Sequence, residues 1–131
     1  MRGLSLFAFL TGVLSLLVAP TASADPVYLD VKANSTTNVA ALPSWDAQCR
    51  FNGYPRVLVR GKPKHGQISV RNVSRVDIPA NAGACAGKVV AGTIITYTPN
   101  RNYQGQDTAV LIVYAPKGGT FFRADVILTI Q

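Results

Sequence analysis

The carboxyl-terminal stretch of the chain indicates its fold class. It reads Asp107-Thr-Ala-Val-Leu-Ile-Val-Tyr114, then Ala115-Pro-Lys-Gly-Gly119, then Thr120-Phe-Phe-Arg-Ala-Asp-Val-Ile-Leu-Thr-Ile-Gln131. The first run is almost entirely apolar, which is typical of a central strand buried on both faces. The last run alternates, and one of its faces would carry Phe122, Ala124, Val126, Leu128 and Ile130. Two such runs around a Pro-Lys-Gly-Gly turn predict a β-hairpin.

Upstream of this hairpin the sequence predicts further strands. Val, Ile and Thr make up 28 of residues 25–131, and these β-branched side chains suit a pleated surface. Gly, Pro and Asn separate the predicted strands, which span residues 27–33, 39–42, 56–60, 67–70 and 88–98. Residues 70–78 either continue the fourth of these or form its connection to the next. Residues 88–98 form either a strand pair or one strand bent at Gly92. About seven strands joined by turns predict an all-β fold, a single Greek-key β-sandwich.

Residues 1–24 have the build of a cleaved secretory signal peptide. Arg2 precedes an apolar run over residues 4–19, Pro20 ends the run, and Ala22-Ser23-Ala24 supplies the small residues that precede a cut. The apolar run is shorter than the roughly 20 residues that a membrane-spanning helix needs. We therefore expect cleavage after Ala24 and export to the periplasm or the outside of the cell. The mature domain would be residues 25–131, without a transmembrane segment.

Export gives the two cysteines, Cys49 and Cys85, a structural meaning, because an exported compartment is oxidising. They permit one intramolecular pairing. A metal pair or a redox pair fits poorly, because the cysteines are far apart and neither has a His or a second Cys beside it. We expect a structural disulfide that ties the small-residue loop at residues 79–87 to the irregular segment at residues 43–54. Trp45 is expected to pack beside it.

Three motifs in the second half of the chain follow one another in a definite order. They are Pro63-Lys64-His65-Gly66-Gln67-Ile68, Ile95-Thr96-Tyr97-Thr98-Pro99 and Tyr103-Gln104-Gly105-Gln106-Asp107, before the carboxyl-terminal hairpin. In this combination, residues 56–131 resemble the bacterial Ig-like and cadherin-like β-sandwich domains of secreted and cell-surface proteins. The resemblance implies an Ig-like sandwich and says little about function, since this fold carries many roles.

The motif residues are expected to have structural roles at one corner of the sandwich. Tyr97 and Tyr103 would pack there with their hydroxyls bonded to backbone, as in a tyrosine corner. Gly66 and Gly105 would supply turns with positive φ, and Pro99 would end a strand.

Asp107 is expected to accept N–H bonds from the loop that precedes it. Its alternative role, binding Ca²⁺ as in cadherin-type domains, would need six to eight oxygens from several carboxylates. The chain has six scattered Asp and no Glu, so we expect no metal site. Two features depart from the family pattern: the domain is a single basic copy rather than an acidic tandem repeat, and it carries a disulfide-pinned loop.

The sequence contains no motif of catalysis or cofactor binding. His65 is the only histidine and stands on a predicted turn between Lys64 and Gly66. A nucleophile elbow, a metal-binding His pair, a P-loop and a dinucleotide fingerprint are all missing. We therefore expect no catalytic residue and no cofactor, and interpret the protein as a non-enzyme.

Positive charge is concentrated in one window. The chain has 13 Lys and Arg against 6 Asp, a net charge of +7, and loss of Arg2 with the signal peptide leaves 12 against 6, a net charge of +6. Residues 50–75 contain seven cations and no acid: Arg50, Arg56, Arg60, Lys62, Lys64, Arg71 and Arg75. Alternation would place Arg56, Leu58 and Arg60 on one face of a strand. The last six cations form a candidate basic binding face, whose alternative is an ordinary solvated surface.

Two functions of different classes fit these features. The first is a small exported binding or structural module that meets an unknown protein or an anionic envelope polymer through the basic face. The second is a protease inhibitor that presents residues 62–66 or the loop at residues 79–87 to an active-site cleft. Nucleic acid is a less suitable partner, because the protein is expected to be exported and lacks interleaved exposed aromatic residues.

Overall fold

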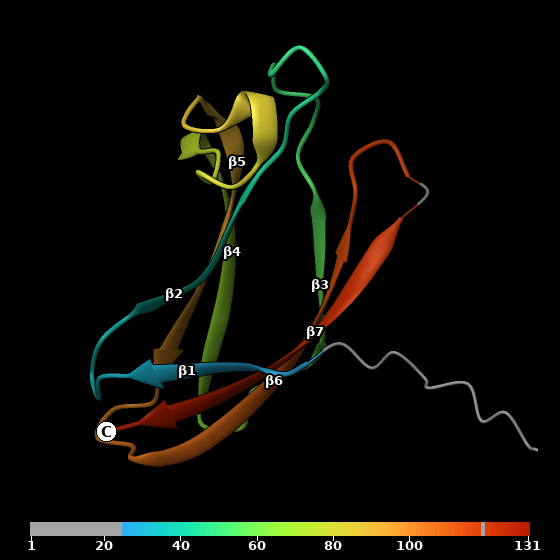
Figure 1. The fold of residues 1–131 in the computed structure, drawn as a ribbon. Helices are drawn as coiled ribbons and strands as arrows, with labels where there is room; N and C mark the ends of the chain where they lie inside the picture. The colour runs from blue at the N-terminus through green and yellow to red at the C-terminus, as the bar shows by residue number, and fades with distance from the viewer. Residues whose placement is uncertain (1–24, 119) are drawn as a thin grey trace, which may run out of the picture.

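The computed structural model describes residues 25–118 and 120–131, and this part of the chain forms seven strands and one short 3₁₀ turn (Figure 1). In chain order they are β1 (Val27–Val31), β2 (Thr37–Pro43), β3 (Arg56–Gly61), β4 (Gly66–Asp77), η1 (Gly83–Cys85), β5 (Val89–Pro99), β6 (Gly105–Tyr114) and β7 (Phe121–Ile130). The all-β prediction is confirmed. The predicted signal peptide, residues 1–24, lies outside the described residues. A helix of the length and apolarity required to cross a membrane does not occur in the described part.

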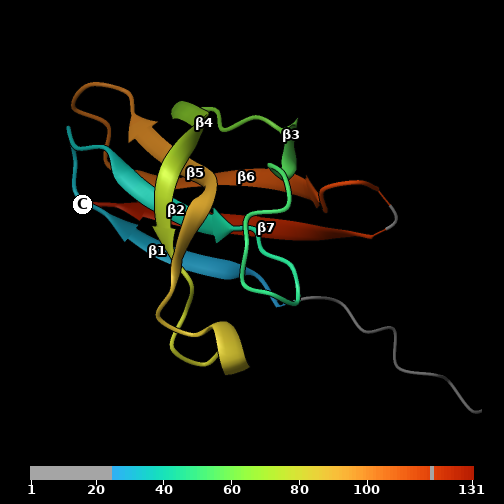
Figure 2. The ribbon, with the colours of Figure 1, turned by 90° about the horizontal axis from the view of Figure 1, so that it is seen from above.

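The strands form two packed sheets. One contains four strands in the order β1-β7-β6-β3, and the other contains three in the order β2-β5-β4. β1 runs parallel to β7, and the remaining pairs of described strands are antiparallel. Figure 2 shows the strands of the two layers crossing at an angle. The predicted two-sheet sandwich of seven strands is therefore confirmed.

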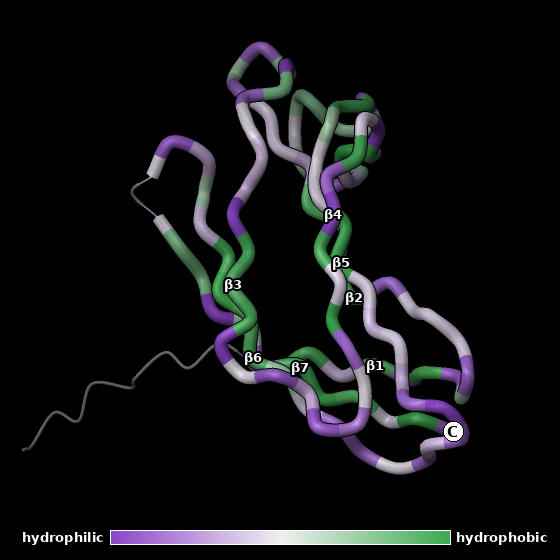
Figure 3. Tube along the Cα trace, turned by 180° about the vertical axis from the view of Figure 1, so that it is seen from behind, coloured by the Kyte–Doolittle hydropathy of each residue, from purple (hydrophilic) through white to green (hydrophobic). Residues whose placement is uncertain are grey.

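The main core lies between the two sheets and draws on both of them. Its buried members are Val31, Ile95, Tyr97, Ala109, Leu111, Val126, Leu128 and Ile130. The last three are among the side chains predicted on the inner face of the last strand, whereas Phe122 on that face is 53% exposed. Figure 3 shows hydrophobic stretches within the strands and many hydrophilic residues at the turns, as burial of apolar surface requires.

β5 is one continuous strand, and Gly92 is neither a turn nor a bulge within it. Gly92 lies opposite Pro43 of β2 and Val73 of β4. A Cβ at this position would come within 2.9 Å of Pro43 Cα and even closer to the carbonyl oxygen of Leu42. The irregularity instead lies in β4, just after Val73. Gly92 therefore allows the backbones of neighbouring strands to approach closely.

A second, smaller core surrounds the disulfide. Cys49 and Cys85 are bonded with an S–S distance of 2.10 Å and a Cα–Cα distance of 5.3 Å. Cys85, Ile78 and Val90 are buried there, and Trp45 and Cys49 pack against them. The predicted pairing and the predicted position of Trp45 are both confirmed.

Three connections lie together at one end of the sandwich, which we call the loop end (Figure 1). They join β2 to β3, β4 to β5, and β6 to β7. The disulfide links the first connection to the second. Gly53 in the first connection lies against Pro116 in the third, since a Cβ on Gly53 would be 3.1 Å from Pro116 Cβ. The loop end is thus held by covalent and packing contacts between its parts.

Candidate functional site

The six cations of the predicted basic face lie along one side of the sandwich. They are Arg56 and Arg60 on β3, Lys62 and Lys64 on the β3–β4 turn, and Arg71 and Arg75 on β4. All six are exposed. β3 and β4 are outermost strands of their respective sheets, so these residues form a set that we call the basic edge.

The basic edge wraps around the sandwich instead of covering one flat face. On β3, Val57 and Val59 pack against the main core, so the alternating Arg56 and Leu58 point outward as predicted. On β4, Arg71 lies opposite Ile94, which stands between the buried Thr93 and Ile95 of β5 and thus belongs to the outer face. The outer faces of two packed sheets point in opposite directions, so the cations spread over both.

The cations of the basic edge lack carboxylate partners within the described residues. The salt bridges of this part of the chain join Arg50 to Asp46 at 3.6 Å and Arg123 to Asp125 at 3.1 Å. Arg50, the seventh cation of the charged window, therefore belongs to the loop end. Arg56 lies over the ring of Tyr114, 4.5 Å from its centroid. None of the six side chains forms a salt bridge within the described residues, so the basic edge has an excess of positive charge that would attract an anion.

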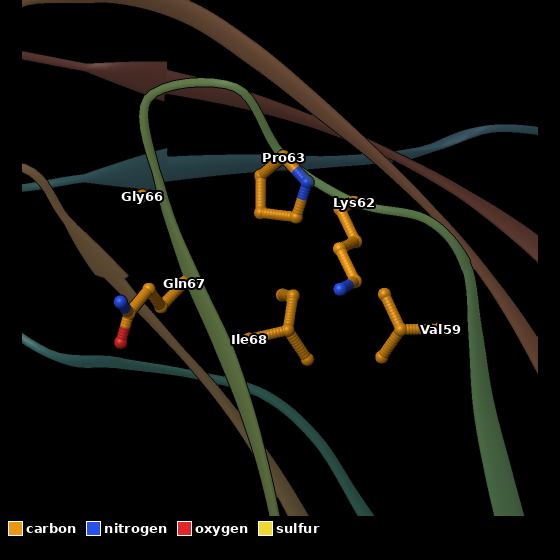
Figure 4. A pocket seen from close by; sticks show the side chains of 6 residues that line it. All are labelled: Val59, Lys62, Pro63, Gly66, Gln67 and Ile68. Carbon is orange, nitrogen blue, oxygen red and sulfur yellow. The ribbon is translucent and has the colours of Figure 1, made fainter.

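A pocket of about 310 Å³ opens in the basic edge between β3 and β4. Its lining consists of Val59, Lys62, Pro63, Gly66, Gln67 and Ile68. Figure 4 shows the side chains of Lys62, Val59 and Ile68 directed toward one another, with Gln67 pointing to the other side of its strand. The pocket therefore combines one ammonium group with apolar walls, which suits an anionic group attached to an apolar body.

The buried carboxyl of Asp107 fixes the backbone of the β3–β4 turn by hydrogen bonds. Its carboxyl oxygens accept the backbone N–H groups of Lys64 and His65, each at 3.0 Å. They also accept the Tyr97 hydroxyl at 2.7 Å and the Thr108 N–H at 3.0 Å. Asp107 is only 4% exposed, so these four donors replace the water that burial removes. Burial, together with the hydrogen bond to Asp107, raises the pKa of the Tyr97 hydroxyl above its usual range.

The predicted corner residues come together, but two of their contacts differ from expectation. Tyr103 donates its hydroxyl to the Gln106 carbonyl at 2.6 Å, a backbone contact as predicted. Tyr97 donates to the Asp107 carboxyl rather than to backbone. Asp107 accepts from the β3–β4 turn rather than from the loop before it. The reason is that a fully buried hydroxyl and a buried carboxyl satisfy each other, while pairing of β3 with β6 brings the turn within reach.

Of the two glycines and the proline at the corner, two agree with the prediction and one does not. Gly105 has a φ of 129°, as predicted, and Pro99 is the last residue of β5. Gly66 does not have a positive φ. It is needed for space, because a Cβ there would lie 2.6 Å from the Thr98 carbonyl oxygen. The predicted turn conformation at Gly66 is therefore wrong, and close packing takes its place.

Several contacts that the sequence did not predict complete the corner and the basic edge. Asn34 accepts the backbone N–H of Asn102 at 2.8 Å and thereby joins two turns. His65 stacks on Tyr103 with ring centroids 4.1 Å apart and planes within 4°. Asparagine in a turn is a recognisable signal for positive φ, which both asparagines adopt. Tyr114 beneath Arg56 has no such signal, because the contact depends on strand register.

Within the described residues, no group of three or more His, Cys, Asp or Glu side chains could hold a metal ion. No protein-family model matches the sequence, and no curated protein or solved structure is significantly similar to the chain.

Proposed function

We propose that this protein is an exported, non-catalytic binding module that recognises an anionic polymer of the cell envelope through the basic edge. One observation carries the proposal: six exposed cations, none paired with a carboxylate in the described part, lie along the outermost strands β3 and β4 and their turn, and one of them, Lys62, lines a pocket between these strands. A group of unpaired charges of one sign raises the local concentration of an oppositely charged partner. An acidic polysaccharide or a lipopolysaccharide has this character.

The rigidity of the β3–β4 turn supports the same proposal. Lys62 and Lys64 stand on a turn whose backbone is anchored twice by the buried Asp107. A further backbone bond runs from the N–H of Asn100 to the carbonyl of His65 at 2.7 Å. A pre-ordered site loses less conformational entropy on binding than a mobile one does. The two lysines are therefore well placed to hold an anion.

We infer further that the sandwich is Ig-like, as the corner motifs imply. In an Ig domain the third, sixth and seventh strands share one sheet, and the second, fourth and fifth strands share the other. The strand orders β1-β7-β6-β3 and β2-β5-β4 agree with this division, with the first strand placed beside the last. The tyrosine and aspartate contacts of the corner add to the support.

Protease inhibition is the second candidate function, and the anchored turn is the observation that favours it. Inhibitors of this type present a rigid exposed loop, and Lys64 lies exposed on the turn that Asp107 holds. The loop at residues 79–87 is the other candidate, pinned through Cys85. If the protein is an inhibitor, changing the loop that it presents should abolish inhibition of the protease even when the cations of β3 and β4 are left intact.

The test of the first proposal is a charge reversal of the basic edge. The variant Arg56→Glu, Arg60→Glu, Lys62→Glu and Lys64→Glu should bind immobilised polygalacturonate and lipopolysaccharide micelles at least tenfold more weakly than the natural sequence. Binding by the unaltered protein should fall steeply as salt is raised from 50 to 300 mM, because salt screens exposed charges. The variant should lose this salt dependence.

The matched control reverses four exposed cations elsewhere: Lys32, Lys88, Arg101 and Lys117. It has the same net charge as the test variant and should bind within about twofold of the natural protein. Equal loss in both variants would mean that net charge alone drives binding, and no loss in the test variant would mean that the basic edge is not the site. Either result would reject the proposal.

A further inference from the structure

The first half of β7 has an open edge, on the side of the sheet away from the basic edge. β6 pairs with β7 along the whole strand from Phe121 to Ile130, whereas β1 pairs with it only from Val126 onward. Figure 1 shows the β6–β7 hairpin extending past β1 toward the loop end. Among the described strands, none covers the second edge of residues 121–125. Half of the backbone N–H and C=O groups there point away from β6, toward this uncovered side.

An apolar groove runs beside this open edge, between the two sheets. A pocket of about 320 Å³ is lined by Leu42, Val113 and Phe122 among others, and a second of about 120 Å³ shares these three residues and adds Ala124. Because the pockets share part of their lining, we treat them as one groove and call it the β7 groove. Phe122 is 53% exposed, so a large aromatic ring of the inner face lacks the cover that burial in the core would give.

With cleavage after Ala24, the segment that precedes β1 is too short to close the β7 groove. Val27 lies opposite Val126, so in the same parallel register Pro26 and Asp25 would reach only Asp125 and Ala124. Cleavage after Ala24, on which this step and the proposed export both depend, leaves no residue before Asp25 to cover the start of β7. Pro26 also lacks the N–H that a ladder bond needs.

We propose that the β7 edge accepts an extended segment of a partner protein, which adds to β7 as a strand in line with β1. Its main chain would bond to the open N–H and C=O groups, and alternate side chains would enter the β7 groove. The groove lining selects apolar residues at those alternate positions. The side chains between them would lie on the outer face beside the ion pair of Arg123 and Asp125, where polar residues fit.

The test uses the full chain, expressed with its own amino-terminal segment and purified after export, with the new terminus verified by mass spectrometry. The probe is the peptide Gln-Val-Thr-Leu-Gln-Val-Thr-Leu-Gln, acetylated at its amino terminus and amidated at its carboxyl terminus, so that it carries no charge and the basic edge does not contribute to binding. Saturating peptide should slow amide hydrogen exchange at alternate residues between Phe121 and Asp125 at least tenfold. Phe122→Asp should abolish this protection. Tyr28→Asp should retain it, because Tyr28 is 71% exposed on β1 and does not line the groove.

The control for folding is amide hydrogen exchange in β5 and β6, which should be as slow in each variant as in the natural protein. Protection that is absent, that appears on another strand, or that a shuffled peptide with adjacent apolar residues produces equally would overturn the proposal. Protection that grows with protein concentration without peptide would assign the edge to a second copy and also overturn it. Retention of residues 1–24 in the exported protein would do so as well, whereas failure of polymer binding at the basic edge would leave this proposal standing.

Discussion

Asp107 is a buried carboxyl group whose hydrogen-bond donors come from three separate parts of the chain. Two belong to the β3–β4 turn, one to Tyr97 on β5, and one to the neighbouring Thr108. The carboxyl therefore connects both sheets at the corner. Such a network contributes more to the free energy of unfolding than the sum of its separate hydrogen bonds. Removal of the carboxyl would leave several buried donors without an acceptor.

The raised pKa of Tyr97 predicts a loss of stability in alkaline solution. The folded protein keeps this phenolic proton at pH values where the unfolded chain has lost it. The contribution is therefore complete below about pH 10, the ordinary pKa of tyrosine, and declines as the pH rises above that value. Urea unfolding between pH 8 and pH 11.5 measures this decline.

Tyr97→Phe is the control for this experiment. It should be less stable than the natural protein by about 2 kcal/mol at pH 8, because it loses a bond to a charged acceptor. Above pH 10 its stability should fall less steeply, because the titrating group is gone. Parallel curves for the two proteins would contradict the assignment.

At the scale of elements, the outermost strands β3 and β4 are the ones that carry the basic edge. β4 has 12 residues and a bulge after Val73, and both its charges and its bulge discourage pairing with another chain. The first half of β7 has a single charge pair and an apolar groove. The two sides of the sandwich therefore differ in the partners that they would admit.

The middle of the β2-β5-β4 sheet depends on one glycine. Gly92→Ala should destabilise the fold by about 2–3 kcal/mol, because the added methyl group meets backbone atoms that cannot rotate away. Gly87→Ala should cost about 1 kcal/mol, since its φ of 78° is unfavourable but no atom lies within 4 Å of the added Cβ. Thermal or urea unfolding of both variants gives the comparison. A Gly92→Ala protein as stable as the Gly87→Ala protein would contradict the packing argument.

The whole molecule consists of a main core between the sheets and a small core at the loop end. The disulfide belongs to the small core, where it joins two connections and packs with Trp45. The turn that presents Cys49 is held by Asp46, whose carboxyl accepts the N–H groups of Gln48 and Arg50. These hydrogen bonds, chiefly the one from the Arg50 N–H, lower the pKa of the Asp46 carboxyl.

Removal of the disulfide should lower the free energy of unfolding and should also increase local opening at the loop end more than in the main core. For a separation of 36 residues, the double variant Cys49→Ser and Cys85→Ser should lose about 4 kcal/mol in the chain-entropy model. Amide exchange should accelerate most at residues 44–55 and 78–88, with the least change in β6. Uniform acceleration over all strands would show that the two cores unfold as one unit.

The sequence by itself determined the strand content, the two-sheet sandwich, the disulfide and the burial of Val126, Leu128 and Ile130 in the last strand. These follow from local alternation, turn residues and the presence of two cysteines, which need no knowledge of distant contacts. Sequence reasoning also identified Tyr97, Tyr103 and Asp107 as corner residues, although it assigned two of their partners incorrectly.

Only the tertiary structure decided which strands are outermost, and therefore that the cations wrap around an edge. It alone placed Lys62 at an apolar pocket and gave Asp107 its donors from the β3–β4 turn. It also made Gly66 and Gly92 points of close approach, and it left the first half of β7 paired only with β6 among the described strands. All of these depend on strand order and register, which pair residues far apart in the chain. A local pattern specifies the face that a side chain takes, but it does not specify what lies across from it.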